Sequence, residues 1–295
     1  MKNQIIVTGG AGFIGSNLIK LLIEKTKYKI ISLDNYSTGS KKNHINNKRI
    51  IYLKGENRNI FSILGSRKNK IKTIFHFGEF SRIYQSFKHI DKCYYSNMLG
   101  TFQVVKFCSN NNIRIIYSAS SSKFGNKGKD EHLSPYSWSK SKNIEFIENF
   151  NKWYGLKYEI LYFYNVYGPG QIKNSEMAAV IGIFETQYLQ RKKLTVVRPG
   201  TQKRDFTHVR DIVNGCYLAF LKGKNDHYLL GTKKTFTVLE IAKMFKSKIK
   251  MLPARPGERL SSFYNTNISF TKLGYKPTIN IKDYIKDFIY KNKRR

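Results

Sequence analysis

The chain has 295 residues, of which 41% are hydrophobic, and a formal net charge of +34. This length and composition are typical of a globular protein with one or two domains, and no apolar stretch approaches the ~20 residues of a membrane span. The charge would suit nucleic-acid binding, but the lysines are spread along the whole chain and accompany no RNA- or DNA-binding motif. We therefore expect neither a membrane protein nor a nucleic-acid-binding protein.

The first predicted element is a short strand, Ile5–Val7, which runs directly into the glycine-rich segment Thr8–Gly15. The glycines of this segment follow the spacing G-x-x-G-x-x-G. Gly9 permits a tight turn, Gly12 lets backbone N–H groups approach a phosphate, and Gly15 lets the next helix pack closely on the strand. The positive N-terminal end of that helix favours an anion. The segment therefore predicts a pyrophosphate site.

A second predicted strand, Ile30–Leu33, ends in Asp34. A carboxylate about twenty residues after the glycine motif is placed to bind the hydroxyl groups of an adenosine ribose. The two features together predict a dinucleotide-binding site. Because the first strand stands at the start of the chain, we expect no signal peptide before it.

Strand-like runs and helical runs then alternate through the first half of the chain. This βαβα order predicts an α/β protein with a doubly wound parallel Rossmann sheet, which binds its ligands at the carboxyl ends of the strands. The expected strands are Ile50–Leu53, Thr73–Phe77, Ile113–Tyr117 and Tyr158–Phe163, and the expected helices are Asp91–Asn110 and Pro135–Tyr154.

The pattern changes after Tyr164–Gly170, where glycine and proline mark a break. The elements beyond it are shorter, and we expect them to form a smaller C-terminal α/β lobe that binds the substrate. The predicted division is a Rossmann domain over 1–165, to which 205–232 returns, and a substrate lobe over 166–204 and 233–295. The elements expected here are the helices Ala178–Gln190, Val209–Leu221, Val238–Phe245 and Ile281–Tyr290 and the strand Leu194–Val197.

The three cysteines, Cys93, Cys108 and Cys216, lie far apart in the sequence and lack the spacing of metal ligands. Scattered cysteines in odd number are typical of reduced thiols in a cytoplasmic protein. We therefore expect no metal site and a cytoplasmic location.

The residues that could carry chemistry include Tyr136 and Lys140, which stand four apart near the start of a predicted helix and so face the same way. An ammonium beside a phenol favours the phenolate and lowers the phenol pKa from about 10. Tyr136 is therefore a candidate general base for a sugar hydroxyl. Upstream, Ser120 follows the fifth predicted strand, where its hydroxyl could hydrogen-bond the reacting oxygen and share a proton with Tyr136.

Several further motifs occur in one order along nearly the whole chain, and together they are far more specific than any one of them. They are Gly9–Gly15, Asp34–Gly39, His76-Phe77, Asn97–Thr101, Ser118–Gly125, Tyr136–Lys140, Tyr164–Pro169, Arg204–Val209 and Arg255–Glu258. On these residues the chain resembles the extended short-chain dehydrogenase/reductases, and it is most similar to the UDP-glucose 4-epimerase branch of the nucleotide-sugar enzymes.

The resemblance implies an NAD cofactor, a UDP-sugar substrate and the catalytic residues Ser120, Tyr136 and Lys140. The glycine loop would line the pyrophosphate, and Asp34 would hold the adenosine ribose, which favours NAD over NADP. The residues implied to bind the cofactor are Gly9, Gly12, Phe13, Ile14, Gly15, Asp34, Asn35, Ser37, Gly39, Glu56, Phe77, Gly78, Asn97, Tyr136 and Lys140. Those implied to bind the substrate are Ser120, Tyr136, Tyr164, Asn165, Arg204, Arg255, Glu258 and Ser262.

The implied reaction is C4 epimerisation of UDP-glucose and UDP-galactose through a 4-keto sugar. Tyr136 would remove the C4 hydroxyl proton while hydride passes to NAD, and the hydride would return to the other face of the sugar. A small residue at Ser262 would leave room at C2, so N-acetyl sugars would also be accepted. The helices expected over 91–110 and 135–154 correspond to those that pair two subunits in relatives, which implies a homodimer.

Four residues depart from the family pattern. Glu56 stands where a shorter aspartate usually meets adenine, and Glu258 replaces an aspartate in the uridine-ribose motif. Glu79 and Arg82 stand where small or neutral residues are more usual. These two residues form either a partly solvated ion pair or a contact to a substrate hydroxyl.

Other activities stay open. A 4,6-dehydratase would need an Asp-Glu pair directly after the hydroxyl residue, where this chain has Ser121 and Ser122. A UDP-glucuronate decarboxylase or uronate epimerase meets no such conflict. A catalytically idle nucleotide- or RNA-binding protein on the same fold is a further alternative, against which the set Ser120, Tyr136 and Lys140 argues.

Overall fold

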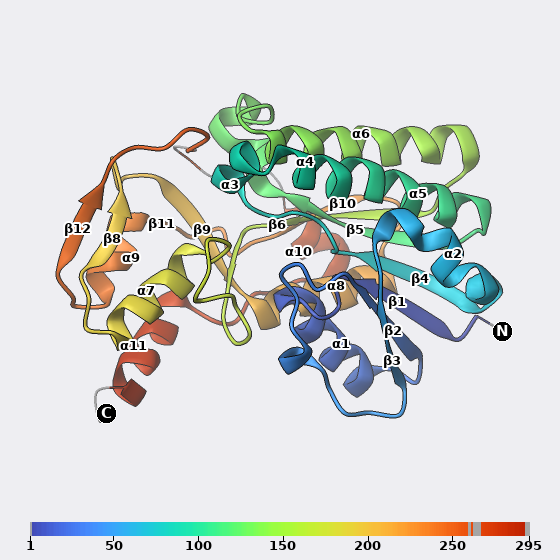
Figure 1. The fold of residues 1–295 in the computed structure, drawn as a ribbon, viewed down its shortest axis with the longest axis horizontal. Coiled ribbons are helices and arrows are strands. Elements are labelled where there is room, and N and C mark those ends of the chain that lie inside the picture. The colour runs from blue at the N-terminus through green and yellow to red at the C-terminus, as the bar shows by residue number, and fades with distance from the viewer. Residues whose placement is uncertain (1, 259–260, 262–266, 293–295) are drawn as a thin grey trace.

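Two parts of unequal size make up the protein in the computed structural model, which describes residues 2–258, 261 and 267–292 (Figure 1). The larger part holds a seven-stranded sheet, and the smaller part, on the left in Figure 1, holds two short sheets. The strands of the large sheet are β1 (Gln4–Thr8), β2 (Lys29–Asp34), β3 (Ile50–Lys54), β4 (Ile71–His76), β5 (Arg114–Ser120), β6 (Tyr158–Phe163) and β10 (His227–Leu230).

The strands of the large sheet lie in the order β10-β6-β5-β4-β1-β2-β3, and every neighbouring pair is parallel. Because β1 lies between β2 and β4, the chain winds outward from the centre of the sheet in both directions. This arrangement is the doubly wound α/β sheet that the alternation of elements predicts. A sheet of this kind binds ligands beyond the carboxyl ends of its strands, where the winding direction reverses.

Helices cover both faces of the large sheet (Figure 1). Alternate residues of a strand point to opposite faces, so Ile6 packs in the core on one face of the sheet, whereas Ile5 and Val7 pack in the core on the other face. The helices of this part are α1 (Phe13–Lys25), α2 (Ile60–Leu64), α3 (Ile83–Lys88), α4 (Ile90–Cys93), α5 (Gly100–Asn110), α6 (Pro135–Tyr154), α8 (Val209–Lys222) and α10 (Ile268–Leu273). Shorter helical turns are η1 (Lys41–Asn43), η2 (Asn57–Asn59), η3 (Gly65–Lys70), η4 (Tyr94–Leu99) and η5 (Ser121–Gly128).

The smaller part has its own hydrophobic core, which includes Phe184, Phe245 and Ile285. Its sheets have the orders β11-β9-β7 and β12-β8. Its elements are β7 (Asn165–Tyr167), α7 (Val180–Leu189), β8 (Leu194–Val197), β9 (Lys203–His208), β11 (Thr235–Thr237), α9 (Val238–Met244), β12 (Ile249–Leu252) and α11 (Ile281–Asn292). Between them in the chain, α8 and β10 pack on and pair with the large sheet. The domain limits set from the sequence stay a prediction.

Two features differ from the sequence-based expectation. The helix expected over 91–110 is divided into α4, the π-helical turn η4 and α5. The π-helical turn carries Asn97, whose side chain bonds both the backbone N–H and the carbonyl oxygen of Phe80, at 2.7 and 3.1 Å. The sequence also did not predict α2, α3, α10, β7 or β9 to β12. Each of these elements has three to six residues, too few to show a clear period.

Within the described ranges, no helix combines the length and the apolar character that crossing a bilayer requires.

Candidate active site

A cleft of about 1000 Å³ opens beyond the carboxyl ends of β1, β2, β4 and β5, with residues of the smaller part on its other side. Most residues selected from the sequence line it, although they come from distant parts of the chain. These are Gly9, Gly12, Phe13, Ile14, Gly15, Asp34, Asn35, Ser37, Glu56, Phe77, Gly78, Ser120, Tyr136, Lys140, Tyr164, Asn165, Arg204, Arg255 and Glu258. Gly39 and Asn97 are not among the residues that line it, and Ser262 lies outside the described residues.

The turn after β1 leaves no room for side chains. Gly9 has a φ of +68°, and a Cβ atom there would lie 2.9 Å from the Cα atom of Gly78. A Cβ atom on Gly15 would lie 2.2 Å from the Gly9 carbonyl oxygen, so α1 can approach the turn only because glycine stands there. Gly12 is the N-cap of α1, and no side chain caps this helix. The backbone N–H groups at the helix start therefore fit the pyrophosphate of a dinucleotide.

Asp34 ends β2 beside this turn. Its Oδ2 accepts a hydrogen bond from the N–H of Ala11 at 2.9 Å, and its Oδ1 accepts one from the N–H of Tyr36 at 2.8 Å. Burial raises the pKa of the Asp34 carboxyl, and these two hydrogen bonds oppose the rise. A Cβ atom on Gly39 would lie 2.7 Å from Oδ1, so glycine there leaves space for the carboxylate. The carboxylate is thereby fixed at the edge of the cleft, where it fits a pair of ribose hydroxyls.

Other residues at this end are also held by short polar contacts. Glu56, which stands in place of a shorter acid, lies next to Asn35, whose Nδ2 is 3.2 Å from both carboxylate oxygens. Phe77 and Gly78 follow β4, and their backbone N–H groups both donate to Thr8 Oγ1, at 3.1 and 3.0 Å. The glycine turn, Asp34 and these residues together fit NAD.

The catalytic candidates Ser120 and Tyr136 stand at the ends of regular elements. Ser120 is the last residue of β5, and its Oγ accepts hydrogen bonds from the backbone N–H of Ser122 at 3.2 Å and from the Ser122 hydroxyl at 2.9 Å. The hydrogen of Ser120 therefore stays available to an oxygen in the cleft. Tyr136 lies in the first turn of α6, where its backbone N–H donates to Ser86 Oγ at 3.2 Å.

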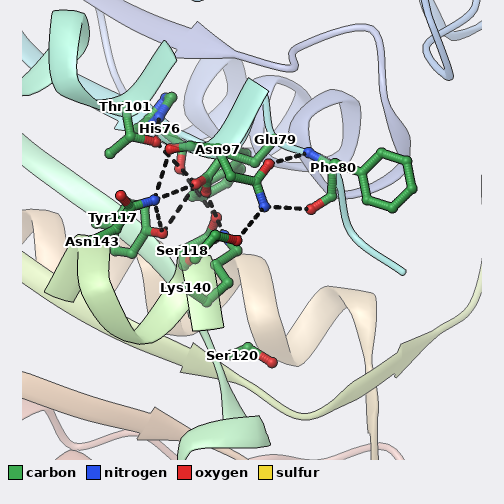
Figure 2. Close-up of polar contacts among 12 residues, drawn as sticks. His76, Glu79, Phe80, Asn97, Thr101, Tyr117, Ser118, Ser120, Lys140 and Asn143 are labelled. Carbon is green, nitrogen blue, oxygen red and sulfur yellow. Dashed lines mark hydrogen bonds and ion pairs between the residues drawn. The ribbon is translucent and has the colours of Figure 1, made fainter. Parts of the chain in front are cut away.

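Lys140 forms a buried ion pair with Glu79 (Figure 2). The two side chains are only 6% and 1% exposed. The Lys140 ammonium also donates to the carbonyl oxygen of Ser118 at 2.5 Å, and it lies 4.7 Å from the centre of the Tyr117 ring. An ammonium has three N–H donors, so one remains for a ligand. The sequence predicts a lysine beside the candidate base, but it did not predict that Glu79 neutralises this lysine.

The second oxygen of Glu79 is equally well bonded. Oε1 accepts hydrogen bonds from the hydroxyls of Thr101 and Tyr117, each at 3.0 Å, and from Nδ2 of Asn143 at 3.1 Å. A buried carboxylate is tolerated when it is paired and hydrogen-bonded in this way. The hypothesis of a partly solvated ion pair between Glu79 and Arg82 is therefore wrong, because Glu79 is buried and pairs with Lys140.

A chain of hydrogen bonds joins this network to the glycine turn. Thr8 Oγ1 accepts two backbone N–H groups, so its own hydrogen points to Nδ1 of His76, 2.8 Å away. Nε2 of His76 then donates to Thr101 Oγ1 at 2.9 Å, and Thr101 donates to Glu79. Burial lowers the pKa of His76 to about 4. A neutral His76 ring with its hydrogen on Nε2 gives each of these side chains both the donor and the acceptor that its hydrogen bonds need.

Arg82 is the N-cap residue of α3 and lines the cleft together with Tyr136. Its Nε donates to the carbonyl oxygen of Met177 at 2.7 Å, and its Nη1 donates to that of Ser81 at 2.8 Å. Burial lowers the pKa of Arg82, and the phenol of Tyr136 opposes that shift. Arg82 thus connects the loop after β4 with the segment before α7.

The far end of the cleft carries two more arginines. Arg204 of β9 donates through Nη2 to Oε1 of Glu258 at 3.1 Å. The guanidinium of Arg255 lies 5.1 Å from the centre of the Tyr84 ring on α3. The planar fork of arginine suits phosphate oxygens, so this end of the cleft fits a nucleotide diphosphate.

Sequence reasoning missed most of the network around Lys140. Glu79 did carry a signal, since an acid at its position is unusual in the family. Thr101 ends the motif Asn97–Thr101, but no role could be assigned to it from the sequence. Tyr117 and Asn143 belong to no motif named above, and only tertiary packing brings the three residues to one carboxylate.

Comparisons with known proteins agree with this geometry. Residues 5–231 match the model of the NAD dependent epimerase/dehydratase family. A putative UDP-glucose 4-epimerase of Methanocaldococcus jannaschii is 32% identical to this chain over an alignment of 302 positions, gaps included, which covers 96% of each chain.

Two of the solved structures that resemble this chain match it over nearly its whole length. The UDP-glucose 4-epimerase of Thermotoga maritima with UDP-glucose has a TM-score of 0.89 at 26% identity, over 99% of each chain. The UDP-glucuronic acid 4-epimerase of Bacillus cereus in complex with UDP-glucuronic acid and NAD has a TM-score of 0.87 at 25% identity, again over 99% of each chain.

Proposed function

The chain belongs to the NAD-dependent epimerase/dehydratase family, and on this basis we propose that it interconverts the C4 epimers of a UDP-hexose. The observation that carries the proposal is that Ser120, Tyr136 and Lys140 line one cleft, between a dinucleotide cradle and the arginines Arg204 and Arg255. A base and a hydroxyl donor placed between a nicotinamide cofactor and a nucleotide sugar suit oxidation of a sugar hydroxyl.

The chain's own residues move the proton and hold the reacting oxygen. Bound NAD supplies a hydride acceptor that can return the hydride to the sugar. Tyr136 takes the proton of the C4 hydroxyl and gives it back when the alcohol forms again. Ser120 donates its free O–H to the same oxygen and so holds it beside Tyr136. Lys140 offers its remaining N–H to the cofactor ribose, and Glu79 fixes the direction of the ammonium. If the 4-keto sugar rotates in the site before the hydride returns, the hydride adds to its other face and the product is the C4 epimer.

The substrates proposed are UDP-glucose and UDP-galactose, together with their N-acetyl forms. The N-acetyl forms depend on space at C2, which the family pattern assigns to Ser262, a residue outside the described ranges. Ser262→Tyr should abolish turnover of UDP-N-acetylglucosamine and spare turnover of UDP-glucose, because a large ring would exclude the acetamido group.

A 4,6-dehydratase is the less suitable alternative, because elimination of water needs an acid and a base beside Ser120. The next two residues, Ser121 and Ser122, are buried serines. An enzyme of UDP-glucuronate meets no such objection, and the guanidinium of Arg82 in the cleft would suit an acidic sugar.

We also propose that the protein is a homodimer in solution. Large apolar side chains stay exposed on η4, α5 and α6, namely Leu99, Phe102, Trp138, Trp153 and Tyr154. Such an accumulation of exposed apolar groups on neighbouring helices is typical of an interaction surface. Sedimentation velocity should give a dimer at micromolar concentration and a monomer for Phe102→Glu. A monomeric wild-type protein would contradict the proposal.

Incubation of the purified protein with UDP-glucose, UDP-N-acetylglucosamine and UDP-glucuronate tests the proposed reaction. Chromatography that resolves epimers, coupled to mass spectrometry, should detect a product of unchanged mass and new retention time. A product that has lost water or carbon dioxide would identify a dehydratase or a decarboxylase instead. Conversion of none of the three sugars would favour nucleotide binding without catalysis.

A further inference from the structure

Among the residues that the structure describes, Lys140 and Arg82 are cationic and lie at the reaction end of the cleft, but only Lys140 has a carboxylate partner. The Lys140 ammonium is paired with Glu79. Glu79 has no capacity for a second cation, because Oε1 already accepts three hydrogen bonds and Oε2 binds Lys140. Glu79 therefore does not neutralise the positive charge of Arg82, although it stands only three residues before it in the chain.

The guanidinium of Arg82 is nevertheless held in one direction. Its Nε and Nη1 donate to the carbonyl oxygens of Met177 and Ser81, at 2.7 and 2.8 Å. Across residues 2–258, 261 and 267–292, these are the hydrogen bonds that Arg82 makes, and no carboxylate lies within ion-pair distance of it. A guanidinium has five N–H donors, so most of them remain open. A partly buried cation with open donors favours an anion in the adjoining space.

The position of Arg82 indicates which part of a ligand it would meet. Ser86 follows Arg82 by one helical turn on α3, and its hydroxyl accepts the backbone N–H of Tyr136. Helix α3 therefore lies against the start of α6, and Arg82 and Tyr136 both line the cleft. The opposing effect of the Tyr136 phenol on the pKa of Arg82 agrees with this proximity.

We propose that Arg82 binds an anionic group of the nucleotide sugar, either a carboxylate on the hexose or the phosphate nearest to it. This inference rests on the proposed function, which places a sugar hydroxyl at Tyr136. A group beside Tyr136 must then lie on or near the hexose. The carboxylate fits better, because Arg204 and Arg255 line the part of the cleft where we place the diphosphate, so Arg82 would let the site take a uronic acid in addition to the neutral hexoses proposed above.

The test compares Arg82→Gln with Arg82→Lys and with the control Lys88→Gln. Lys88 lies on the same helix, and its side chain is 73% exposed in a surface ion pair with Glu176. Binding of UDP, UDP-glucose and UDP-glucuronate is measured by calorimetry, and kcat/KM is measured for both sugars. Loss of a charge-assisted hydrogen bond should weaken UDP-glucuronate binding about 10- to 100-fold in Arg82→Gln. Arg82→Lys keeps the charge but not the fork, so its loss should be smaller.

The outcomes separate the two anions and the two claims. A loss confined to UDP-glucuronate identifies the carboxylate, whereas an equal loss for UDP and both sugars identifies the phosphate. Unchanged binding and kcat/KM in Arg82→Gln would overturn the inference while leaving the proposed function intact. If the wild-type protein converts neither sugar and Arg82→Gln still binds UDP-glucuronate more weakly than the wild type does, the inference is supported and the proposed function is contradicted. A wild-type protein that binds none of the three ligands would contradict both.

Discussion

The two ends of the cleft are built in different ways. At the cofactor end, one stretch of chain from Thr8 to Asp34 supplies the turn, the helix start and the ribose acid. Its contacts are backbone–backbone hydrogen bonds and backbone N–H groups that donate to the Asp34 carboxylate. At the reaction end, Lys140 is held by Glu79 from the loop after β4, and side chains of β5, α5 and α6 hold Glu79 in turn.

This difference determines how each end should respond to substitution. A site made from backbone groups keeps most of its contacts when one side chain is lost. A buried polar network instead leaves a charge or a donor without its partner when one member is removed. We therefore expect the larger effects at the reaction end.

The largest effect is expected for Tyr136→Phe, which removes the proposed base and changes the volume little. Turnover should fall roughly 10²–10⁴-fold, the usual contribution of general acid–base catalysis, while the NAD content of the protein stays the same. Steady-state assays and the cofactor released on denaturation check both parts. Activity close to that of the wild type would assign the base to another residue.

Glu79→Ala should have the next largest effect, because it leaves the Lys140 ammonium buried without its counter-ion. Breaking a buried pair from one side costs about 3–5 kcal/mol of unfolding free energy. The control is Glu145→Ala on α6, where the side chain is 47% exposed and pairs with Lys142 at the surface. That change should cost no more than about 0.5 kcal/mol. Urea denaturation measures both, and equal losses would contradict the role given to the network.

The neutral state of His76 makes stability depend on pH. Its pKa is about 4 in the folded protein and about 6.5 when unfolded, so the unfolded chain binds the extra proton between these values. Stability should therefore fall as pH decreases from 6.5 to 4, by up to about 3 kcal/mol from this residue. Urea denaturation across this range should give a shallower pH dependence for His76→Gln. His132→Gln, at an exposed histidine, should leave the slope unchanged. Equal slopes for all three proteins would exclude His76 as a cause.

The smallest effect is expected at the cofactor end. Asp34→Asn keeps the shape of the side chain but places an amide group where the carboxylate accepts two backbone N–H groups. NAD affinity of the cofactor-free protein should fall about tenfold, the equivalent of one net hydrogen bond. Calorimetry measures this value, and kcat at saturating NAD should change little because Tyr136 is unaffected. Unchanged affinity would remove Asp34 from the cofactor site.

The same contrast explains what the sequence could and could not predict. Helix α6 and strand β6 begin and end at the residues expected from the sequence, because each is a long or strongly apolar run. The glycine turn and Asp34 were predictable because one local segment contains the whole motif. The Lys140–Glu79 pair was not, since its members lie 61 residues apart and meet only when α6 and the loop after β4 come together in the folded protein. The π-helical turn that directs Asn97 to Phe80 likewise has no sequence period of its own.

The proposed mechanism requires that the hydrogen on C4 leave and return within one site while Tyr136 and Ser120 hold the hydroxyl proton. Incubation of the purified protein with UDP-glucose deuterated at C4, without added cofactor, tests it directly. Nuclear magnetic resonance should detect UDP-galactose that retains deuterium at C4. An epimer that has exchanged this deuterium with solvent, or the absence of any epimer, would contradict this mechanism.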